Sequence, residues 1–405
     1  MRTKSGFHTF ESSQRQMGRK LHGLLEVGRT PLIGIAETLH RSCLIAASIA
    51  LLLGLAAGSA HAQWTQLGAD IDGEVAGDQA FVVAISEDGS RLAVGARYHA
   101  SEAGQVRAFD WNGSSWIQSA QDIFGEVTGD WTGTAIALSA DGTRIAVGSS
   151  LHNGIADNSG CVRVFDRDGI GWVQVGDTIE GAGETAYAGA AVALSADGQR
   201  LAVGAWGYDG TYGTDSGYVR VYQVYGVIPG GYEWQQIGQA VEGDSSFVRL
   251  GWSVALSADG SRLAVGGPNA DPPGESAGLV EVYSYNHNDD VWYQLGSDIH
   301  SADGDQVGKS VALSAAGSRL AVGAPFADAN GIDSGLARVY QFQGFPIYDW
   351  LQVGTDIPGE NPGDQAGMAV ALSANGSRVA VGAPLHDHGF PFTAVSYTHL
   401  TLPTN

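Results

Sequence analysis

Residues 254–266 read VALSADGSRLAVG, a stretch that recurs along the chain. Two apolar runs flank the pair Asp259-Gly260, and a D-G pair between apolar runs is a strong signal for a β-hairpin. The second run, Arg262 to Gly266, is almost continuously apolar, as expected of a strand that is covered on both faces. The stretch therefore predicts two antiparallel strands, Ser253 to Ser257 and Arg262 to Gly266, in a packed core.

Five other copies follow the same pattern. The central valines of the six copies, spaced by 53 to 62 residues, are Val94, Val147, Val203, Val265, Val322 and Val381. A second landmark, W-x-Q-[LVI]-G, starts at Trp64, Trp172, Trp234, Trp292 and Trp350, with a degenerate copy at Trp116. The two landmarks stay in phase, which indicates a repeat architecture.

Each repeat supplies four strands, as Leu279 to Tyr283 and Trp292 to Leu295 follow the hairpin in the clearest copy. One such sheet cannot bury both of its faces, so neighbouring sheets must stack on each other. Radial stacking predicts an all-β fold, a β-propeller of four-stranded blades with six repeats visible and a core that includes Val203, Val265 and Val322. A flat β-solenoid is the alternative, but its coils are usually much shorter than these repeats.

The repeats resemble FG-GAP repeats, the family of the integrin alpha propeller and of many secreted bacterial proteins. The likeness lies in Gly251 to Leu256 leading into Leu263 to Gly266, and in Ala321 to Pro325 leading into Gly335 to Tyr340. It covers about residues 64 to 393. The resemblance implies a ring that most often has seven blades, so we expect the six visible repeats to be truncated from a seven-bladed ring. It also implies roles in adhesion or protein recognition.

Calcium binding is expected to differ from that of the family. Integrin-type hairpins carry D-x-D-x-D-G, which gives calcium several oxygen ligands, whereas this hairpin reads S-[AE]-[DAN]-G, as in Ser195 to Gly198. One carboxylate is too few, so the hairpin sites are not carried over. The string DANGID makes Asp328, Asn330 and Asp333 a candidate calcium site, because D-x-N-G-x-D brings oxygen ligands round a glycine turn. A plain Asx or glycine turn is the alternative.

The N-terminus has the pattern of a secretory signal. Cys43 to Gly58 is an uncharged apolar run that is followed by the A-x-A site Ala60-His61-Ala62. We predict cleavage before Gln63, so residues 1–62 are a signal peptide with an over-long leader, for which Met17 is a candidate true start. The protein is then exported and extracellular, periplasmic or at the cell surface. A retained N-terminal anchor is the alternative.

The net charge excludes two classes of partner, and the cysteine count excludes a disulfide. The formal net charge is −22, and Lys309 is the only lysine after residue 62. This sign repels phosphate backbones and anionic bilayers, so we expect neither nucleic-acid binding nor stable membrane insertion after signal cleavage. Only Cys161 follows the signal, so no intramolecular disulfide is expected.

Two long loops of each repeat lie on the same rim because neighbouring strands are antiparallel. The two-to-three loop joins strands two and three, and the four-to-one loop joins strand four to strand one of the next repeat. The four-to-one loop repeats D-I-x-G-E-x-x-G-D, with acidic residues at Asp70, Glu74, Asp78, Asp122, Glu126, Asp130, Asp356, Glu360 and Asp364. The two-to-three loop adds Asp157, Asp209, Asp215, Asp328 and Asp333. The G-D pairs are interpreted as turn residues rather than ligands. We expect a protein or glycan ligand on this acidic long-loop face.

Two further groups of polar residues are interpreted as structural. An arginine follows each hairpin, at Arg91, Arg144, Arg200, Arg262, Arg319 and Arg378, and its repetition favours a packing or ion-pair role over a substrate clamp. His386 and His388 present two imidazoles, but a metal site would need a further ligand that the sequence does not identify.

Familiar enzyme motifs are missing. The chain has no G-x-S-x-G, H-E-x-x-H, P-loop or C-x-x-C, and its hairpin lacks the tryptophan of the sialidase Asp-box. We therefore predict a secreted or cell-surface binding or adhesion module that is not an enzyme and has no certain cofactor. A glycan-acting propeller enzyme and a structural surface-coat protein are the alternatives.

The last residues depart from the repeat. After Gly382-Ala383-Pro384 a G-x-V-R-V-Y strand is expected, but the chain ends in AVSYTHLTLPTN. Val395 to Thr404 resembles the translated end of a sequencing adapter, so we expect the propeller to span residues 63–393 and residues 394–405 to be a non-native tail; a natural tail is the alternative. On that reading Trp64 to Gly68 is an orphan fourth strand that completes the last blade.

Overall fold

The computed structural model describes residues 66–79, 82–227, 231–271, 276–386 and 395–401. The chain divides into two compact units, Met1–Gln66 and Leu67–Asn405, and the fold described here is that of the second. The predicted signal peptide, its cleavage site and His388 lie outside the described residues. None of the helices formed by the described residues is long and apolar enough to span a membrane.

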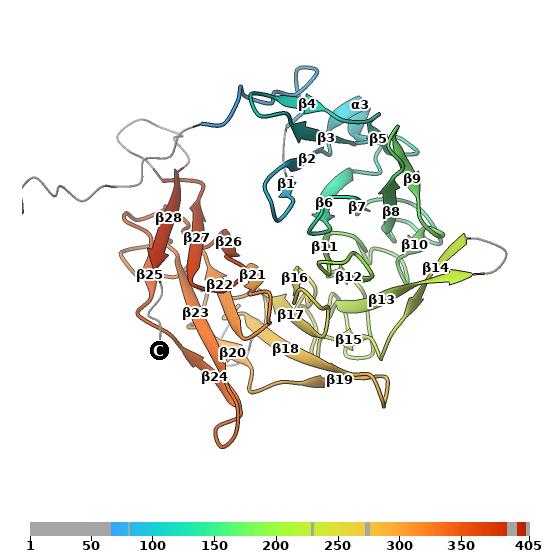
Figure 1. The fold of residues 1–405 in the computed structure, drawn as a ribbon. Coiled ribbons are helices and arrows are strands. Elements are labelled where there is room, and N and C mark those ends of the chain that lie inside the picture. Colours follow the sequence, from blue (N-terminus) through green and yellow to red (C-terminus); the bar gives the residue numbers. More distant parts are fainter. Residues whose placement is uncertain (1–65, 80–81, 228–230, 272–275, 387–394, 402–405) are drawn as a thin grey trace, which may run out of the picture. The chain divides into compact units, whose positions relative to one another are not determined.

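Six antiparallel sheets follow one another along the second unit (Figure 1). This confirms the prediction of an all-β propeller fold with four-stranded blades and six repeats. In the first five sheets the strands pair in chain order, and the fourth strand is broken into two short segments that both pair with the third. The sixth sheet has three described strands, so the seven-bladed ring and its closure stay predictions.

The first three sheets contain the same series of five short strands. The first contains β1 (Val82–Ile85), β2 (Arg91–Ala96), β3 (Gln105–Trp111), β4 (Trp116–Gln118) and β5 (Ile123–Phe124), with the short turn α3 (His99–Glu102) between β2 and β3. The second contains β6 (Thr132–Leu138), β7 (Arg144–Ser149), β8 (Cys161–Arg167), β9 (Trp172–Gln174) and β10 (Ile179–Glu180). The third contains β11 (Ala191–Leu194), β12 (Arg200–Ala205), β13 (Tyr218–Val227), β14 (Gly231–Gln236) and β15 (Val241–Glu242).

The remaining sheets continue the series. The fourth contains β16 (Ser253–Leu256), β17 (Arg262–Gly267), β18 (Leu279–Asn286), β19 (Val291–Gln294) and β20 (Ile299–His300). The fifth contains β21 (Ser310–Leu313), β22 (Arg319–Ala324), β23 (Leu336–Gln343), β24 (Asp349–Gln352) and β25 (Ile357–Pro358). The sixth contains β26 (Ala369–Leu372), β27 (Arg378–Ala383) and β28 (Val395–Thr401).

The core lies between neighbouring sheets. The first strands β6, β11, β16, β21 and β26 contact one another in that order, which places them innermost. Val203, Val265 and Val322 are at most 1% exposed, and each belongs to a cluster that combines residues of two adjacent sheets. The predicted core is therefore confirmed. Close approach of the sheets leaves no room for a side chain at Gly266, where a Cβ would collide with the carbonyl of Gly308.

The rim that carries the one-to-two hairpins links each sheet to the next. In the first five sheets the arginine that follows the hairpin donates from Nη1 to the carbonyl of the hairpin glycine in the next sheet. The pairs are Arg91–Gly142, Arg144–Gly198, Arg200–Gly260, Arg262–Gly317 and Arg319–Gly376, at 2.7 to 3.0 Å. Backbone bonds run beside them, such as Ala196 N–H to Ala258 O at 2.8 Å. The predicted packing role is confirmed for these five arginines, whereas Arg378 in the sixth sheet is exposed.

The outer strands are linked by tryptophan. The indole N–H donates to a carbonyl of the preceding repeat in the pairs Trp116–Leu67, Trp234–Val175, Trp292–Ile237 and Trp350–Leu295, at 2.7 to 3.1 Å. Leu67 therefore occupies the position of a preceding fourth strand. Arg107 likewise binds the carbonyl of Asp72, as Arg163 binds that of Phe124 in the next repeat.

Candidate functional site

The strongest candidate site is a group of aromatic and cationic side chains on the long-loop rim, which we call the aromatic–cation cluster. Its members are Tyr187, Trp206, Arg249, Trp252 and Lys309. Tyr187 precedes β11, Trp206 follows β12, Arg249 and Trp252 precede β16, and Lys309 precedes β21. Loops that enter a first strand and leave a second strand emerge at the same rim of an antiparallel sheet. The cluster therefore spans three successive sheets beside the inner strands.

The three rings form a continuous row. Tyr187 stacks on Trp206 with ring centroids 4.6 Å apart and an interplanar angle of 24°, and Trp206 lies 5.3 Å from Trp252 at 45°. All three side chains are partly exposed. Trp206 and Trp252 also differ from the outer-strand tryptophans, because among the described residues no hydrogen bond engages their indole N–H groups. The row thus presents apolar rings and free donors together.

Two cations lie against this row. The Arg249 guanidinium carbon is 5.1 Å from the Trp206 ring centroid, and Lys309 Nζ is 3.8 Å from that of Trp252, both within cation–π range. Arg249 Nη2 also lies 3.3 Å from Asp215 Oδ2. Within the described part of the chain no carboxylate forms an ion pair with Lys309. Burial and the Arg249 charge lower the pKa of Lys309 to about 8.

The local backbone holds the cluster in place. Tyr187 and Arg249 have left-handed φ angles of 54° and 57°, which are uncommon outside glycine. Their N–H groups donate to the carbonyls of Asn158 at 3.1 Å and Asp215 at 3.0 Å, in the two-to-three loop of the preceding repeat. Interlocked loops thus stabilise a conformation that aims large side chains at the rim.

The sequence interpretation did not identify this cluster. One signal was present in the sequence, at the residue that follows the glycine near the start of strand one. Trp252 and Lys309 occupy this position, whereas other repeats have Thr134, Ala190 and Met368. Two neighbouring repeats thus have a large aromatic residue and the only lysine after residue 62 where the other copies have smaller or apolar residues. A comparison of the copies could have shown this difference.

The predicted calcium residues lie together in the loop between β22 and β23. Asp328 Oδ1 accepts the N–H of Asp333 at 3.0 Å, and Asn330 Nδ2 donates to the carbonyl of Gly359 at 2.7 Å. Neither contact is the bond from a side-chain oxygen to the N–H two residues on that defines an Asx turn. Within the described ranges no group of three or more histidine, cysteine, aspartate or glutamate residues could hold a metal ion. Calcium binding by Asp328, Asn330 and Asp333 stays a prediction.

The aspartates of the G-D pairs have structural roles. Asp78, Asp130 and Asp364 are buried, accept backbone N–H groups of their own turn, and bind the Nδ1 atoms of His99, His152 and His386 at 2.8 to 3.1 Å. Their interpretation as turn residues is confirmed. The charge of these three carboxylates is internal, so the exposed charge of the rim comes from the other acidic residues.

A second unusual group lies on β18. At the position of Glu281 the first, second, third and fifth sheets have an arginine, such as Arg338, which forms an ion pair with Asp356 at 3.0 Å. Glu281 instead accepts a hydrogen bond from the Tyr283 hydroxyl at 3.0 Å. Burial, followed by the charge of Asp298, raises the pKa of Glu281 to about 7. The fourth sheet thus holds a carboxyl group that is partly protonated at neutral pH.

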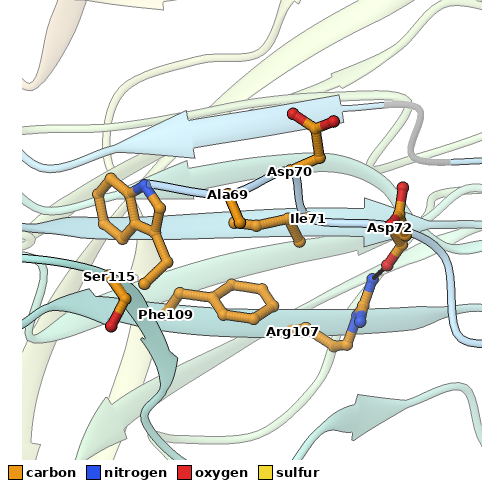
Figure 2. Close-up of a pocket in the computed structure, with 8 residues that line it drawn as sticks. Ala69, Asp70, Ile71, Asp72, Arg107, Phe109 and Ser115 are labelled. Atoms are coloured by element: carbon orange, nitrogen blue, oxygen red, sulfur yellow. Dashed lines mark hydrogen bonds between the residues drawn. The ribbon is translucent and has the colours of Figure 1, made fainter. Parts of the chain in front are cut away.

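A small pocket lies where residues 69–72 meet the first sheet (Figure 2). Its volume is about 240 Å³, and Arg107, Phe109 and Trp116 form its wall on the side of the sheet. Ligand pockets usually have about 300 to 1,000 Å³, so this pocket is small for a ligand site.

Comparisons with known proteins found similar structures but no relative in sequence. No protein-family model matches the chain, and no curated protein matches it in sequence. Kuenenia stuttgartiensis hydrazine synthase is similar in structure at 14% identity and a TM-score of 0.49, with 80% of this chain and 78% of that chain covered. The Pseudomonas aeruginosa periplasmic gluconolactonase PpgL is similar at 20% identity and a TM-score of 0.48, with 70% and 72% covered. The FG-GAP resemblance stays a prediction.

One prediction is wrong in the light of these comparisons. We predicted that the chain is not an enzyme because familiar motifs are missing, yet both similar structures are enzymes by name. One propeller fold supports both catalysis and binding, so missing motifs do not exclude catalysis. The comparisons do not support an adhesion role either. Both TM-scores are below 0.5, so neither likeness supports a statement about a substrate.

Proposed function

We propose that this chain recognises carbohydrate on its long-loop rim, with the aromatic–cation cluster as the surface on which the sugar lies. The observation that carries the proposal is the row Tyr187–Trp206–Trp252, which is partly exposed and spans two adjacent sheets. Sugar rings present C–H groups with small positive charge, and these pack on the negative faces of aromatic rings. The free indole N–H groups can donate to sugar hydroxyls. An aromatic row with free donors suits an amphipathic ligand of this kind.

The tryptophans elsewhere in the fold supply an internal comparison. Trp234, Trp292 and Trp350 are buried, and each uses its indole N–H to join two repeats. Trp206 and Trp252 are more exposed and make no such bond within the described residues. Large aromatic side chains with unsatisfied donors at a surface are typical of binding sites.

Conversion of the bound glycan is a second candidate function, favoured by Lys309. Because its pKa is about 8, a fraction of the amine is neutral near neutral pH and can accept a proton. This candidate predicts turnover, which a binding measurement does not detect. Release of new reducing ends or of unsaturated sugars from a glycan mixture would identify it, and loss of that release in Lys309→Gln would assign the proton acceptor.

Binding is tested with the full chain on an array of neutral and acidic oligosaccharides, followed by titration of each hit with tryptophan fluorescence. We expect Trp252→Ala and Tyr187→Ala to weaken binding at least about tenfold, which corresponds to about 1.4 kcal/mol. Tyr232→Ala is the matched control, because Tyr232 is an exposed aromatic residue on β14. Binding that persists unchanged in folded Trp252→Ala and Tyr187→Ala, or no binding by the wild type to any glycan, would refute the proposal.

A further inference from the structure

We infer that the sugar recognised on this rim carries a carboxylate, which Arg249 and Lys309 bind together. This inference rests on the proposed function and names the class of ligand, a glycan that contains uronic acid. It starts from the location of the two cations. Both lie against the aromatic row, Arg249 at Trp206 and Lys309 at Trp252, so a sugar on the row has cations at its border.

The two cations are close enough to affect each other. Burial is the main cause of the lowered pKa of Lys309, and the charge of Arg249 lowers that pKa further. Only one carboxylate, Asp215, pairs with the two of them among the described residues. Partly buried charges are costly unless they are paired, so the cluster holds one positive charge more than its internal partners balance. An anionic group of the ligand would supply the missing partner.

The setting makes this excess unusual. The chain has a formal net charge of −22, and the long-loop rim is where its acidic loops gather. An unbalanced lysine and an arginine on such a rim give a local site for an anion within a surface that repels other anions. Arg249 offers a planar fork that matches a carboxylate, and Lys309 adds a point charge. The aromatic row then orients the sugar ring that carries the carboxylate.

The test compares two ligands that share the sugar ring and differ in the state of its carboxyl group, ionised or esterified. The full chain is titrated with oligogalacturonate and with its methyl ester, which removes the negative charges and keeps the sugar ring. We expect the acid form to bind at least tenfold more tightly. Lys309→Gln and Arg249→Gln are each expected to remove most of that difference between the acid and the ester. Arg378→Gln is the control, because Arg378 is an exposed arginine on the other rim.

The pH dependence supplies a second readout. Oligogalacturonate affinity should fall as pH rises through about 8, where Lys309 loses its proton, and Lys309→Arg should keep the affinity constant to higher pH. Equal binding of acid and ester, both lost in Trp252→Ala, would overturn the carboxylate inference and leave carbohydrate binding intact. Preference for a sulfated oligosaccharide over the uronate would also overturn it. No binding to either sugar would instead refute the proposed function itself.

Discussion

Replacing Glu281 by glutamine should stabilise the protein, and only at pH values at which the wild-type carboxyl group is ionised. The pKa of Glu281 is raised from 4.5 to about 7, first by burial and then by the charge of Asp298. Each pKa unit is worth about 1.4 kcal/mol, so ionisation of Glu281 in the folded chain costs about 3 kcal/mol relative to the unfolded chain. Below pH 4.5 the group is protonated in both states and contributes nothing.

The sign of the effect follows from proton linkage. Between pH 4.5 and about 7 the folded state keeps the proton that the unfolded state has lost, so wild-type stability falls as pH rises. Above pH 7 the full cost is present and constant. Glu281→Gln is neutral throughout, and its amide can still accept the hydrogen bond from Tyr283. We therefore expect a gain that approaches 3 kcal/mol at pH 8 and is close to zero at pH 4.5.

Urea denaturation at both pH values, monitored by tryptophan fluorescence, measures this gain as a difference in the free energy of unfolding. Glu233→Gln is the matched control, because Glu233 is exposed on β14 and should change stability by less than about 0.5 kcal/mol at either pH. Equal gains for Glu281→Gln at pH 4.5 and pH 8 would show that packing, and not ionisation, is responsible. A loss at pH 8 would contradict the burial of an ionisable carboxyl group at this position.

Three further predictions concern packing. Arg262→Ala should lower the free energy of unfolding by about 1 to 2 kcal/mol, because the side chain loses its hydrogen bond to the next sheet. Arg378 is exposed, so Arg378→Ala should change the free energy of unfolding by less than about 0.5 kcal/mol. Equal losses for the two variants in urea denaturation would contradict the inter-sheet role. Gly260→Ala should cost more than about 1 kcal/mol because φ is +64°, while Gly226→Ala, with open space around it, should be nearly neutral in the same measurement. Cys161 should resist alkylation at pH 8 in the folded protein, since burial raises its pKa to about 12; mass spectrometry of the labelled peptide would detect an unexpected reaction.

The repeat unit was predictable because its signals are local. The D-G hairpin and the apolar runs on either side of it lie within 13 residues, and they correctly indicated two antiparallel strands with Val265 in the core. The sequence predicted that the hairpin arginines have a packing role, but it did not predict their hydrogen-bond acceptors. Repetition indicated packing, but the acceptor of Arg262 is a backbone carbonyl 55 residues away, and no side-chain pattern marks a carbonyl.

The aromatic–cation cluster could not be assembled from the sequence. Its members extend from Tyr187 to Lys309 and enter from three repeats, so only the stacking of the sheets brings them together. The same stacking buried part of the predicted acidic face, because Asp78 and Asp364 turned inward onto histidines. Burial of a loop aspartate depends on a partner from another loop, which periodicity does not reveal.

The contacts between each arginine and the next hairpin glycine have a consequence for how such a chain can diversify. Every internal repeat offers a donor to one neighbour and an acceptor to the other, so its two sides are interchangeable with those of any other copy. Gene duplication or deletion of one repeat would therefore leave compatible neighbours on both sides. The repeated contacts of the opposite rim join backbone atoms, as in Ala188 N–H to Ser159 O and Leu250 N–H to Ser216 O, so its side chains can change one copy at a time. Growth in size and change of ligand can thus proceed separately in the descendants of a single ancestral repeat.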